Sequence, residues 1–181
     1  MASIRSIHNH LFTRLSQLFG GWFLPTLARF VFAAVLLFYF WNSAKTKVSD
    51  GYFGFLTPSD SAYMQIFPKT SKVLGYDSSA LNGFHWLIAV TGTITEFVLP
   101  LLIIIGLFTR IAALGMAGFV MMQSYVDITG HDLGDKDIGA WFDHSSDSLL
   151  MDQRLLWMVL FAILVTKGAG PISLDRMFRN S

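Results

Sequence analysis

Glu96 is the first candidate for chemistry, because it stands in the middle of an apolar segment that runs from residue 84 to residue 108. It is also the only glutamate of the chain. A charged side chain at the centre of a membrane costs roughly 2.5 to 3.5 kcal/mol, and such residues are usually paired or functional. Ala89, Gly92 and Thr93 share its helical face and favour the close approach of another helix. We therefore expect Glu96 to face the interior of a helix bundle.

Arg29 is the basic counterpart, since it is the only charge in an apolar segment from residue 23 to residue 43. It stands about 6 Å along the helix from the middle of that segment, so its side chain can reach the midplane of the membrane. Three alternatives follow. Arg29 pairs with Glu96 inside the bundle, or it extends to the lipid headgroups while a neutral Glu96 bonds to a threonine or a backbone group, or one of the two faces a ligand.

Several other polar side chains stand at helix ends on the side of the predicted bundle opposite both termini, which we call the outer boundary. Charges at helix ends commonly anchor a helix at the interface and brace loops, which is the simpler interpretation. The alternative is a charged vestibule above the bundle. The outer-boundary candidates are Lys47, His85, Asp127, Asp152 and Arg154.

Metal and haem sites need imidazoles or thiolates in suitable places. None of the histidines stands in the middle of an apolar segment, which does not favour a transmembrane haem, and solvation of loop histidines is the simpler interpretation. The chain has no cysteine, which excludes disulfides and cysteine-bound iron–sulfur clusters. We expect no metal site, and the weak candidates are His85, His131 and His144.

No motif predicts an enzyme that acts by itself. The sequence has no nucleophile–base–acid set, no glycine-rich phosphate loop and no GxSxG element, so we assign no catalytic residue. The formal net charge of +1 gives no reason to expect binding of nucleic acid.

The elements that position these residues follow from composition. Apolar residues make up 53% of the 181-residue chain and charged residues only 14%, whereas a soluble domain has roughly 25% charged residues and too little interior for so much apolar surface. We predict an all-α fold, an integral membrane four-helix bundle with an N-terminal interfacial helix. The amphipathic segment is 1–21, the four-helix domain is 22–176 with spans at about 23–43, 84–108, 111–128 and 149–166, and the tail is 177–181.

The order of the spans sets their topology. Only Thr109 and Arg110 separate the second predicted span from the third, so these two spans form a tight hairpin and both termini lie on one side of the membrane. A slight excess of Lys and Arg on that side favours the cytoplasm. We predict a protein of the bacterial inner membrane with both termini in the cytoplasm, and outer loops at 44–83 and 127–148.

Five pieces of the sequence carry a family resemblance. They are Arg29 at the head of the first span, Lys47 just past its end, Glu96 in the second span, the hairpin segment GLFTR at 106–110 with Arg110, and the segment GAGPISLDR at 168–176 with Ser173 and Asp175. In this order and spacing, over roughly residues 24–176, they resemble the DoxX family of small four-helix membrane proteins. The chain differs by Ala33 and Ala34 in place of an expected glycine and by a long outer segment.

The resemblance implies a link to redox or quinone biochemistry, since the family takes its name from membrane proteins associated with archaeal thiosulfate:quinone oxidoreductase. We expect a non-catalytic accessory or membrane-anchoring subunit of a redox-linked system, with the lipid bilayer and a protein subunit or a second copy of the chain as partners. One alternative is a subunit that binds quinone or quinol between helices, where Glu96 could exchange protons with the ring oxygens. Another is a small cation or proton transporter or channel with Glu96 as its site.

Overall fold

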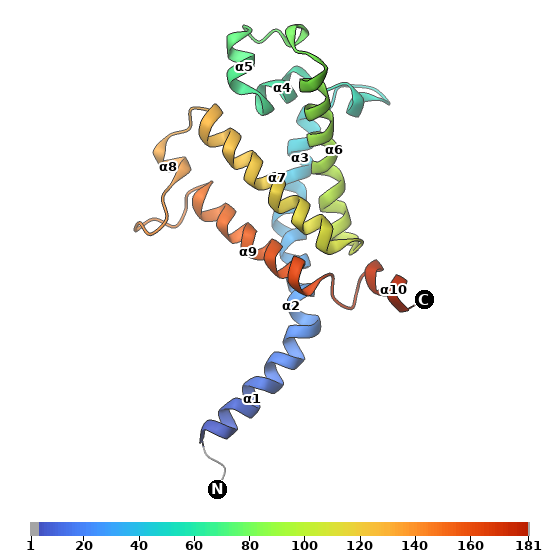
Figure 1. Cartoon of the computed structure of the whole chain (residues 1–181), viewed down its shortest axis with the longest axis vertical. Coiled ribbons are helices and arrows are strands. Elements are labelled where there is room, and N and C mark those ends of the chain that lie inside the picture. The colour runs from blue at the N-terminus through green and yellow to red at the C-terminus, as the bar shows by residue number, and fades with distance from the viewer. Residues whose placement is uncertain (1–3, 181) are drawn as a thin grey trace.

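The computed structural model describes residues 4–180, and the protein is built from helices (Figure 1). Within these residues there is no β-strand, and β pairing is limited to one bridge between Val48 and Pro58. The predicted all-α class is therefore confirmed. The elements are α1 (Ile4–Leu18), η1 (Phe19–Phe23), α2 (Leu24–Phe32), η2 (Ala33–Leu37), α3 (Phe38–Lys47), η3 (Gly54–Leu56), α4 (Asp60–Ile66), α5 (Pro68–Val73), η4 (Ser78–Ala80), α6 (Gly83–Ile105), α7 (Thr109–Gly130), α8 (Asp135–Ile138), α9 (Met151–Lys167) and α10 (Leu174–Asn180).

Residues 4–47 form one long helical rod in which α1, α2 and α3 are joined by the π-helical turns η1 and η2. Pro25 lies in the first turn of α2, where its fixed φ is compatible with a helix. Figure 1 shows α1 leaning away from the bundle, and its apolar side chains Ile7, Leu11 and Leu15 are exposed. An interfacial role for residues 1–21 suits this exposure and stays a prediction, and residues 1–3 lie outside the described part.

Four helical segments pack into a ring. The α2–α3 rod packs against α6 and α9, and α7 packs against both α6 and α9. Their facing side chains form one apolar core in which every member is almost completely buried. This core consists of Ala28, Phe32, Leu36, Phe40, Ile103, Ala112, Ala113, Met116, Val120, Phe161 and Leu164.

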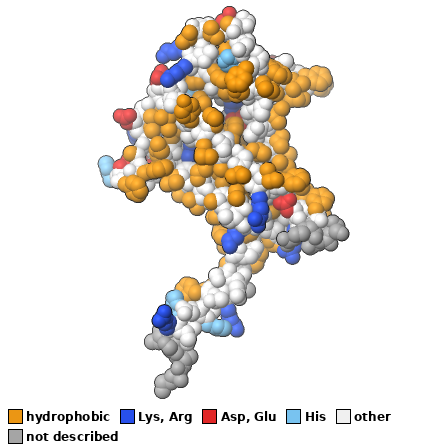
Figure 2. Space-filling model, in the orientation of Figure 1, with side chains coloured by type: hydrophobic (Ala, Val, Ile, Leu, Met, Phe, Trp, Pro, Cys, Tyr) orange, Lys and Arg blue, Asp and Glu red, His pale blue; other side chains and the backbone are white. Residues whose placement is uncertain are grey.

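Three of these segments are long and apolar enough to cross a membrane, by length and composition: Arg5–Lys47, Gly83–Ile105 and Thr109–Gly130. Figure 2 shows apolar side chains spread over the outside of the bundle, as contact with lipid requires. Helix α9 has 17 residues and spans about 26 Å, slightly less than the roughly 30 Å hydrocarbon core. The expected fourth span through α9 stays a prediction.

The hairpin between α6 and α7 is present, but its turn lies earlier than expected. Gly106 ends α6 with φ +71° and Phe108 precedes α7 with φ +49°, so residues 106–108 make the turn and Thr109 and Arg110 belong to α7. The left-handed backbone at Gly106 is the usual way in which a glycine ends a helix. The predicted boundary was wrong because Leu107 and Phe108 extend the apolar run beyond the helix.

The segment between α3 and α6 forms short helices that cover the end of the bundle opposite the hairpin (Figure 1). Ser59 begins α4 by accepting a hydrogen bond from the backbone N–H of Ala62, and Asn82 begins α6 by accepting from the N–H groups of Phe84 and His85. These caps satisfy backbone donors that have no partner within a helix. Helix α4 packs on α3 and α6 and so forms the roof of the site described next.

Candidate functional site

A buried ion pair joins the end of α3 to the middle of α6. Lys47 Nζ donates to Glu96 Oε1 at 2.8 Å and to Glu96 Oε2 at 2.7 Å, and the two side chains are 6% and 3% exposed. Ser43 lies one helical turn before Lys47. Its hydroxyl oxygen accepts a hydrogen bond from Lys47 Nζ at 2.7 Å, and the hydroxyl donates to Glu96 Oε1 at 3.3 Å. The three side chains form a charge-assisted network in an apolar surrounding, where such bonds are strong.

The sequence of α6 explains why Glu96 points inward. Ala89, Thr93, Glu96 and Pro100 form the buried stripe of this helix, with the spacing of one helical face. Thr93 bonds back to the carbonyl of Ala89 at 2.8 Å, so its hydroxyl needs no partner from another helix. The expectation that Glu96 faces the bundle interior is confirmed by its 2% exposure.

Arg29 does not pair with Glu96, and that alternative was wrong. The Arg29 guanidinium instead donates to backbone carbonyls at the hairpin end of the bundle. Its Nε lies 2.9 Å from the carbonyl oxygen of Ile103 and its Nη1 lies 3.0 Å from that of Ala169. Nη1 also donates to Ile172 and Nη2 to Ile104. The last carbonyls of α6 lack partners within the helix. The planar guanidinium has five N–H donors and can bond to several of these carbonyls at once.

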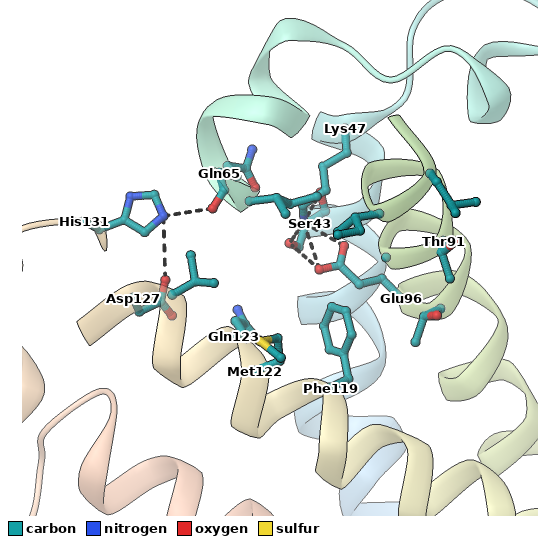
Figure 3. A pocket seen from close by; sticks show the side chains of 16 residues that line it. Ser43, Lys47, Gln65, Thr91, Glu96, Phe119, Met122, Gln123, Asp127 and His131 are labelled. Carbon is teal, nitrogen blue, oxygen red and sulfur yellow. Dashed lines mark hydrogen bonds and ion pairs between the residues drawn. The ribbon is translucent and has the colours of Figure 1, made fainter. Parts of the chain in front are cut away.

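A cavity of about 490 Å³ lies beside the Lys47–Glu96 pair, between α3, α6 and α7 and under α4 (Figure 3). Its size falls within the usual range of small-molecule sites, about 300 to 1,000 Å³. Most of its wall is apolar, and two of its apolar residues, Leu87 and Met122, are 54% and 63% exposed on the outside of the bundle. The cavity therefore borders both the ion pair and the surface that faces lipid. Its further lining residues are Ser43, Gln65, Ile66, Ile88, Thr91, Gly92, Thr95, Phe119, Gln123, Val126, Asp127 and His131.

A second polar group lines the cavity at the end of α7. Asp127 accepts a charge-assisted hydrogen bond from Arg154 Nη2, and Arg154 Nη1 donates to Ser124 Oγ at 2.8 Å. His131 Nε2 lies 3.9 Å from Asp127 Oδ1 and 3.0 Å from the carbonyl oxygen of Gln65 on α4. Figure 3 shows Asp127 and His131 across the cavity from Glu96. The outer-boundary candidates Asp127 and Arg154 are thus brought together.

Gln123 contributes an unused acceptor to the same cavity. Its Nε2 donates to the hydroxyl of Tyr39 at 3.2 Å, whereas its Oε1 is buried and accepts no hydrogen bond from any described residue. A buried polar atom without a partner costs about 1 to 3 kcal/mol. Because Gln123 lines the cavity, this amide oxygen is a candidate acceptor for a ligand that donates a hydrogen bond.

The remaining outer-boundary candidates have structural contacts. Asp152 accepts from the backbone N–H of Ser148 at 3.0 Å and from its Oγ at 2.9 Å, which braces the start of α9. His85 bonds to the Asn82 side chain at 2.7 Å and packs on the ring of Phe67. Among the described residues, no group of three or more His, Asp or Glu side chains is placed to hold a metal ion, so His85, His131 and His144 are not brought together.

The hairpin and the C-terminal segment dock on each other through Asp175. Its carboxylate accepts from the backbone N–H groups of Phe108 at 2.7 Å and Thr109 at 3.0 Å, which caps α7, and its own N–H donates to the carbonyl of Gly106 at 2.8 Å. Ser173 Oγ bonds to the carbonyl of Gly170 at 2.8 Å. Asp175 and Ser173 thus belong to a structural junction at the hairpin end, far along the rod from the cavity.

Sequence reasoning missed the roles of Ser43, Gln65 and Gln123. Ser43 carried a usable signal, because it stands four residues before Lys47 and so on the same helical face. Gln123 carried another, since it is the one amide in the apolar part of its segment. Gln65 contributes a backbone carbonyl, and a backbone contact leaves no trace in residue type.

The DoxX family model matches residues 24–126, which is more than half of the chain. The chain belongs to the DoxX family. The match runs from the start of α2 to within α7 and includes Arg29, Lys47 and Glu96, so the resemblance drawn from the sequence is confirmed, and this DoxX protein is an integral membrane protein. A search of curated proteins and a search of solved structures returned no match.

Proposed function

We propose that this DoxX protein binds a quinol or quinone in the cavity beside Glu96 and serves as the quinone-binding membrane subunit of a redox system. The observation that carries the proposal is the composition of the cavity wall. An apolar slot of about 490 Å³ has the Lys47–Glu96 pair at one side and Asp127 with His131 at the other. A ring with polar oxygens on opposite edges suits such a wall, because the ring packs on apolar side chains while the oxygens reach polar groups.

The entrance supports a ligand that comes from the bilayer. Leu87 and Met122 line the cavity and are also exposed on the outside of the bundle. An isoprenoid tail can therefore remain in lipid while the ring enters between α6 and α7. Contact between an apolar tail and this apolar rim is favourable.

The polar atoms of the wall favour the reduced form, the quinol. All the hydrogen atoms of the Lys47 ammonium already have acceptors in Glu96 and Ser43. Gln123 Oε1 is free of partners, and the carboxylates of Glu96 and Asp127 can each accept further hydrogen bonds. A quinol presents two hydroxyl donors, whereas a quinone presents only acceptors. When bound, the ligand supplies two-electron chemistry; the residues named here bind and orient its ring, and a partner subunit exchanges the electrons.

The same ion pair weighs against transport of a cation along Glu96. Both oxygens of the carboxylate already bond to the ammonium of Lys47. An incoming cation would have to displace this ammonium, which is part of the protein and cannot diffuse away. We therefore do not propose a channel.

Two glycine variants test the binding proposal. Gly92 lines the cavity, and a Cβ added there meets only Ile66 at an ordinary contact distance of 3.8 Å, so Gly92→Leu should fill the cavity without disrupting the helix. Gly118→Leu is the matched control, because a Cβ at Gly118 on α7 meets nothing within 4 Å. The measurement is equilibrium binding of a short-chain ubiquinol to the protein in lipid nanodiscs, with empty nanodiscs subtracted.

We expect Gly92→Leu to weaken quinol binding about tenfold or more, which corresponds to about 1.4 kcal/mol, while Gly118→Leu binds like the unaltered protein. Binding by the unaltered protein that does not exceed partition into empty nanodiscs would refute the proposal. Equal binding by both variants would place the quinol outside this cavity.

A further inference from the structure

A second pocket lies at the opposite end of the bundle, at the junction of the hairpin with the C-terminal segment. Its volume is about 500 Å³, and its walls come from the start of α7, from the end of α9 with the loop that follows it, and from the start of α10. It shares no lining residue with the cavity beside Glu96. The quinol proposal therefore does not use it.

Three basic side chains from three elements line this pocket: Arg110 of α7, Lys167 of α9 and Arg176 of α10. All three are exposed, and no ion pair links any of them to an acidic side chain among the residues that the structure describes. Figure 2 shows Lys and Arg side chains gathered at the end of α9 next to α10. Like charges that line one pocket without an ion-pair partner repel one another, so the arrangement favours a bound anion.

The one acidic residue of the pocket is already engaged. The Asp175 carboxylate accepts the backbone N–H groups of Phe108 and Thr109 at the start of α7. The Arg110 guanidinium lies close to Gly168 on the other wall, since a Cβ on Gly168 would meet Arg110 Nε at 3.3 Å. Gly168 has φ +79°, so both its backbone conformation and the nearby guanidinium favour a residue without a side chain. The pocket thus keeps a net positive charge, because its three basic side chains outnumber the one carboxylate.

The rim of the pocket is apolar and exposed. Phe108 and Ile111 line the pocket and are 62% and 71% exposed at the start of α7. The C-terminal segment that follows the pocket also carries exposed apolar side chains, Ile172 and Met177. Apolar side chains that surround a basic cluster at the end of membrane-spanning helices place the cluster at the level of the lipid headgroups. An anion that reaches it from the membrane carries acyl chains, which the rim can contact.

We propose that this pocket binds the phosphate headgroup of an anionic phospholipid. Arg110, Lys167 and Arg176 donate to the phosphate oxygens, and the acyl chains lie along Phe108 and Ile111. The bound lipid links α7, α9 and α10. Among the described residues, no ion pair joins any two of these helices at this end of the bundle. Its phosphate takes the place of the missing counter-charge.

The test is native mass spectrometry of the whole protein in a mild detergent, with phosphatidylglycerol and phosphatidylcholine of identical chains added in turn. The pocket variant carries Arg110→Gln, Lys167→Gln and Arg176→Gln. The matched control carries Lys45→Gln, Lys69→Gln and Lys136→Gln, which remove the same charge from exposed side chains outside the pocket. Near a membrane surface each basic residue contributes about one factor of five in affinity for anionic lipid.

We expect the unaltered protein and the control to prefer phosphatidylglycerol. The pocket variant should bind phosphatidylglycerol about tenfold more weakly or worse. If the triple variant does not fold, Lys167→Gln alone should lose about threefold to fivefold. Equal losses in the pocket variant and the control, or equal binding of the two lipids, would overturn the proposal. Saturable binding of millimolar inorganic phosphate without a preference for phosphatidylglycerol would also overturn it, because the site would then take a free anion.

Discussion

Lys47 and Glu96 form a bidentate pair in which Nζ lies 2.8 and 2.7 Å from the two carboxylate oxygens, although 49 positions separate them in the chain. Both residues are buried, at 5% and 2% exposure. The pair joins α3 to α6 and at the same time forms part of the wall of the cavity. A single contact therefore sets the register of two helices and supplies the polar side of the proposed ligand site.

Removal of one partner from this pair should destabilise the protein strongly. Glu96→Gln leaves the Lys47 ammonium buried with a weaker acceptor, and Lys47→Met leaves the carboxylate without its cation. Each single variant should lose about 3 kcal/mol or more of unfolding free energy. The double variant Lys47→Met with Glu96→Leu should lose much less, because no buried charge remains. The measurement is unfolding of each variant in mixed detergent micelles.

A double-mutant cycle on these values gives the interaction energy of the pair. Additive effects of the two single substitutions would contradict the pairing seen here. The double variant should nevertheless lose quinol affinity in the nanodisc assay, so its stability and its binding separate the structural role of the pair from its proposed role in the site.

Gly106 provides a second prediction, at the hairpin. Its φ of +71° is a region that side chains rarely adopt, and a Cβ there would lie 2.5 Å from Ser173 Cβ and 3.1 Å from Arg29 Cζ. Gly106→Ala should therefore destabilise the protein by about 1 to 3 kcal/mol. Gly118→Ala, inside α7 with open space around it, should be neutral or stabilising by up to about 1 kcal/mol. Thermal unfolding in one detergent compares the two, and equal midpoints would show that the junction is not tightly packed.

Arg29 should depend on its planar shape as well as on its charge. The guanidinium donates to Ile103 and Ile104 in α6 and to Ala169 and Ile172 in the C-terminal segment. Lysine keeps the charge, but its three hydrogens on one nitrogen cannot reach both segments in this way. Arg29→Lys should cost about 2 kcal/mol and expose the C-terminal segment to protease. Arg14→Lys on the exposed face of α1 is the control, and an equal protease sensitivity of both would disprove the anchoring role.

The sequence predicts the long helices and the single charges within the apolar segments well, because both are local signals. The apolar runs locate the spans, and Glu96 and Arg29 are conspicuous as single charges within them. The turn at residues 106–108 was misplaced because hydrophobicity alone extends α6 through Leu107 and Phe108, whereas the physical signal was the helix-ending Gly106.

The partners of these charges could not be predicted, since they depend on how far one helix is displaced along another. Helix α6 begins beyond the end of α3, which brings Glu96 level with Ser43 and Lys47 at the outer end of α3. The apolar periodicity of each helix is the same whatever its displacement along its neighbour, so it does not predict which side chains lie level with each other. Arg29 binds backbone carbonyls, and every residue has a carbonyl, so no residue type indicated its partners.

Gln123 leads to the prediction that best separates stability from function. Its Oε1 is buried without a partner, and its Nε2 donates only to the exposed hydroxyl of Tyr39, which water can satisfy instead. Gln123→Met, of similar volume, should therefore leave the stability unchanged or raise it by about 1 kcal/mol. If that acceptor receives a quinol hydroxyl, the same variant should bind short-chain ubiquinol about threefold to tenfold more weakly, the loss of one neutral hydrogen bond. Gln153→Met, on the exposed surface of α9, should change neither quantity. A Gln123→Met variant that is less stable and binds quinol normally would contradict both parts, because Gln123 would then be a satisfied structural residue.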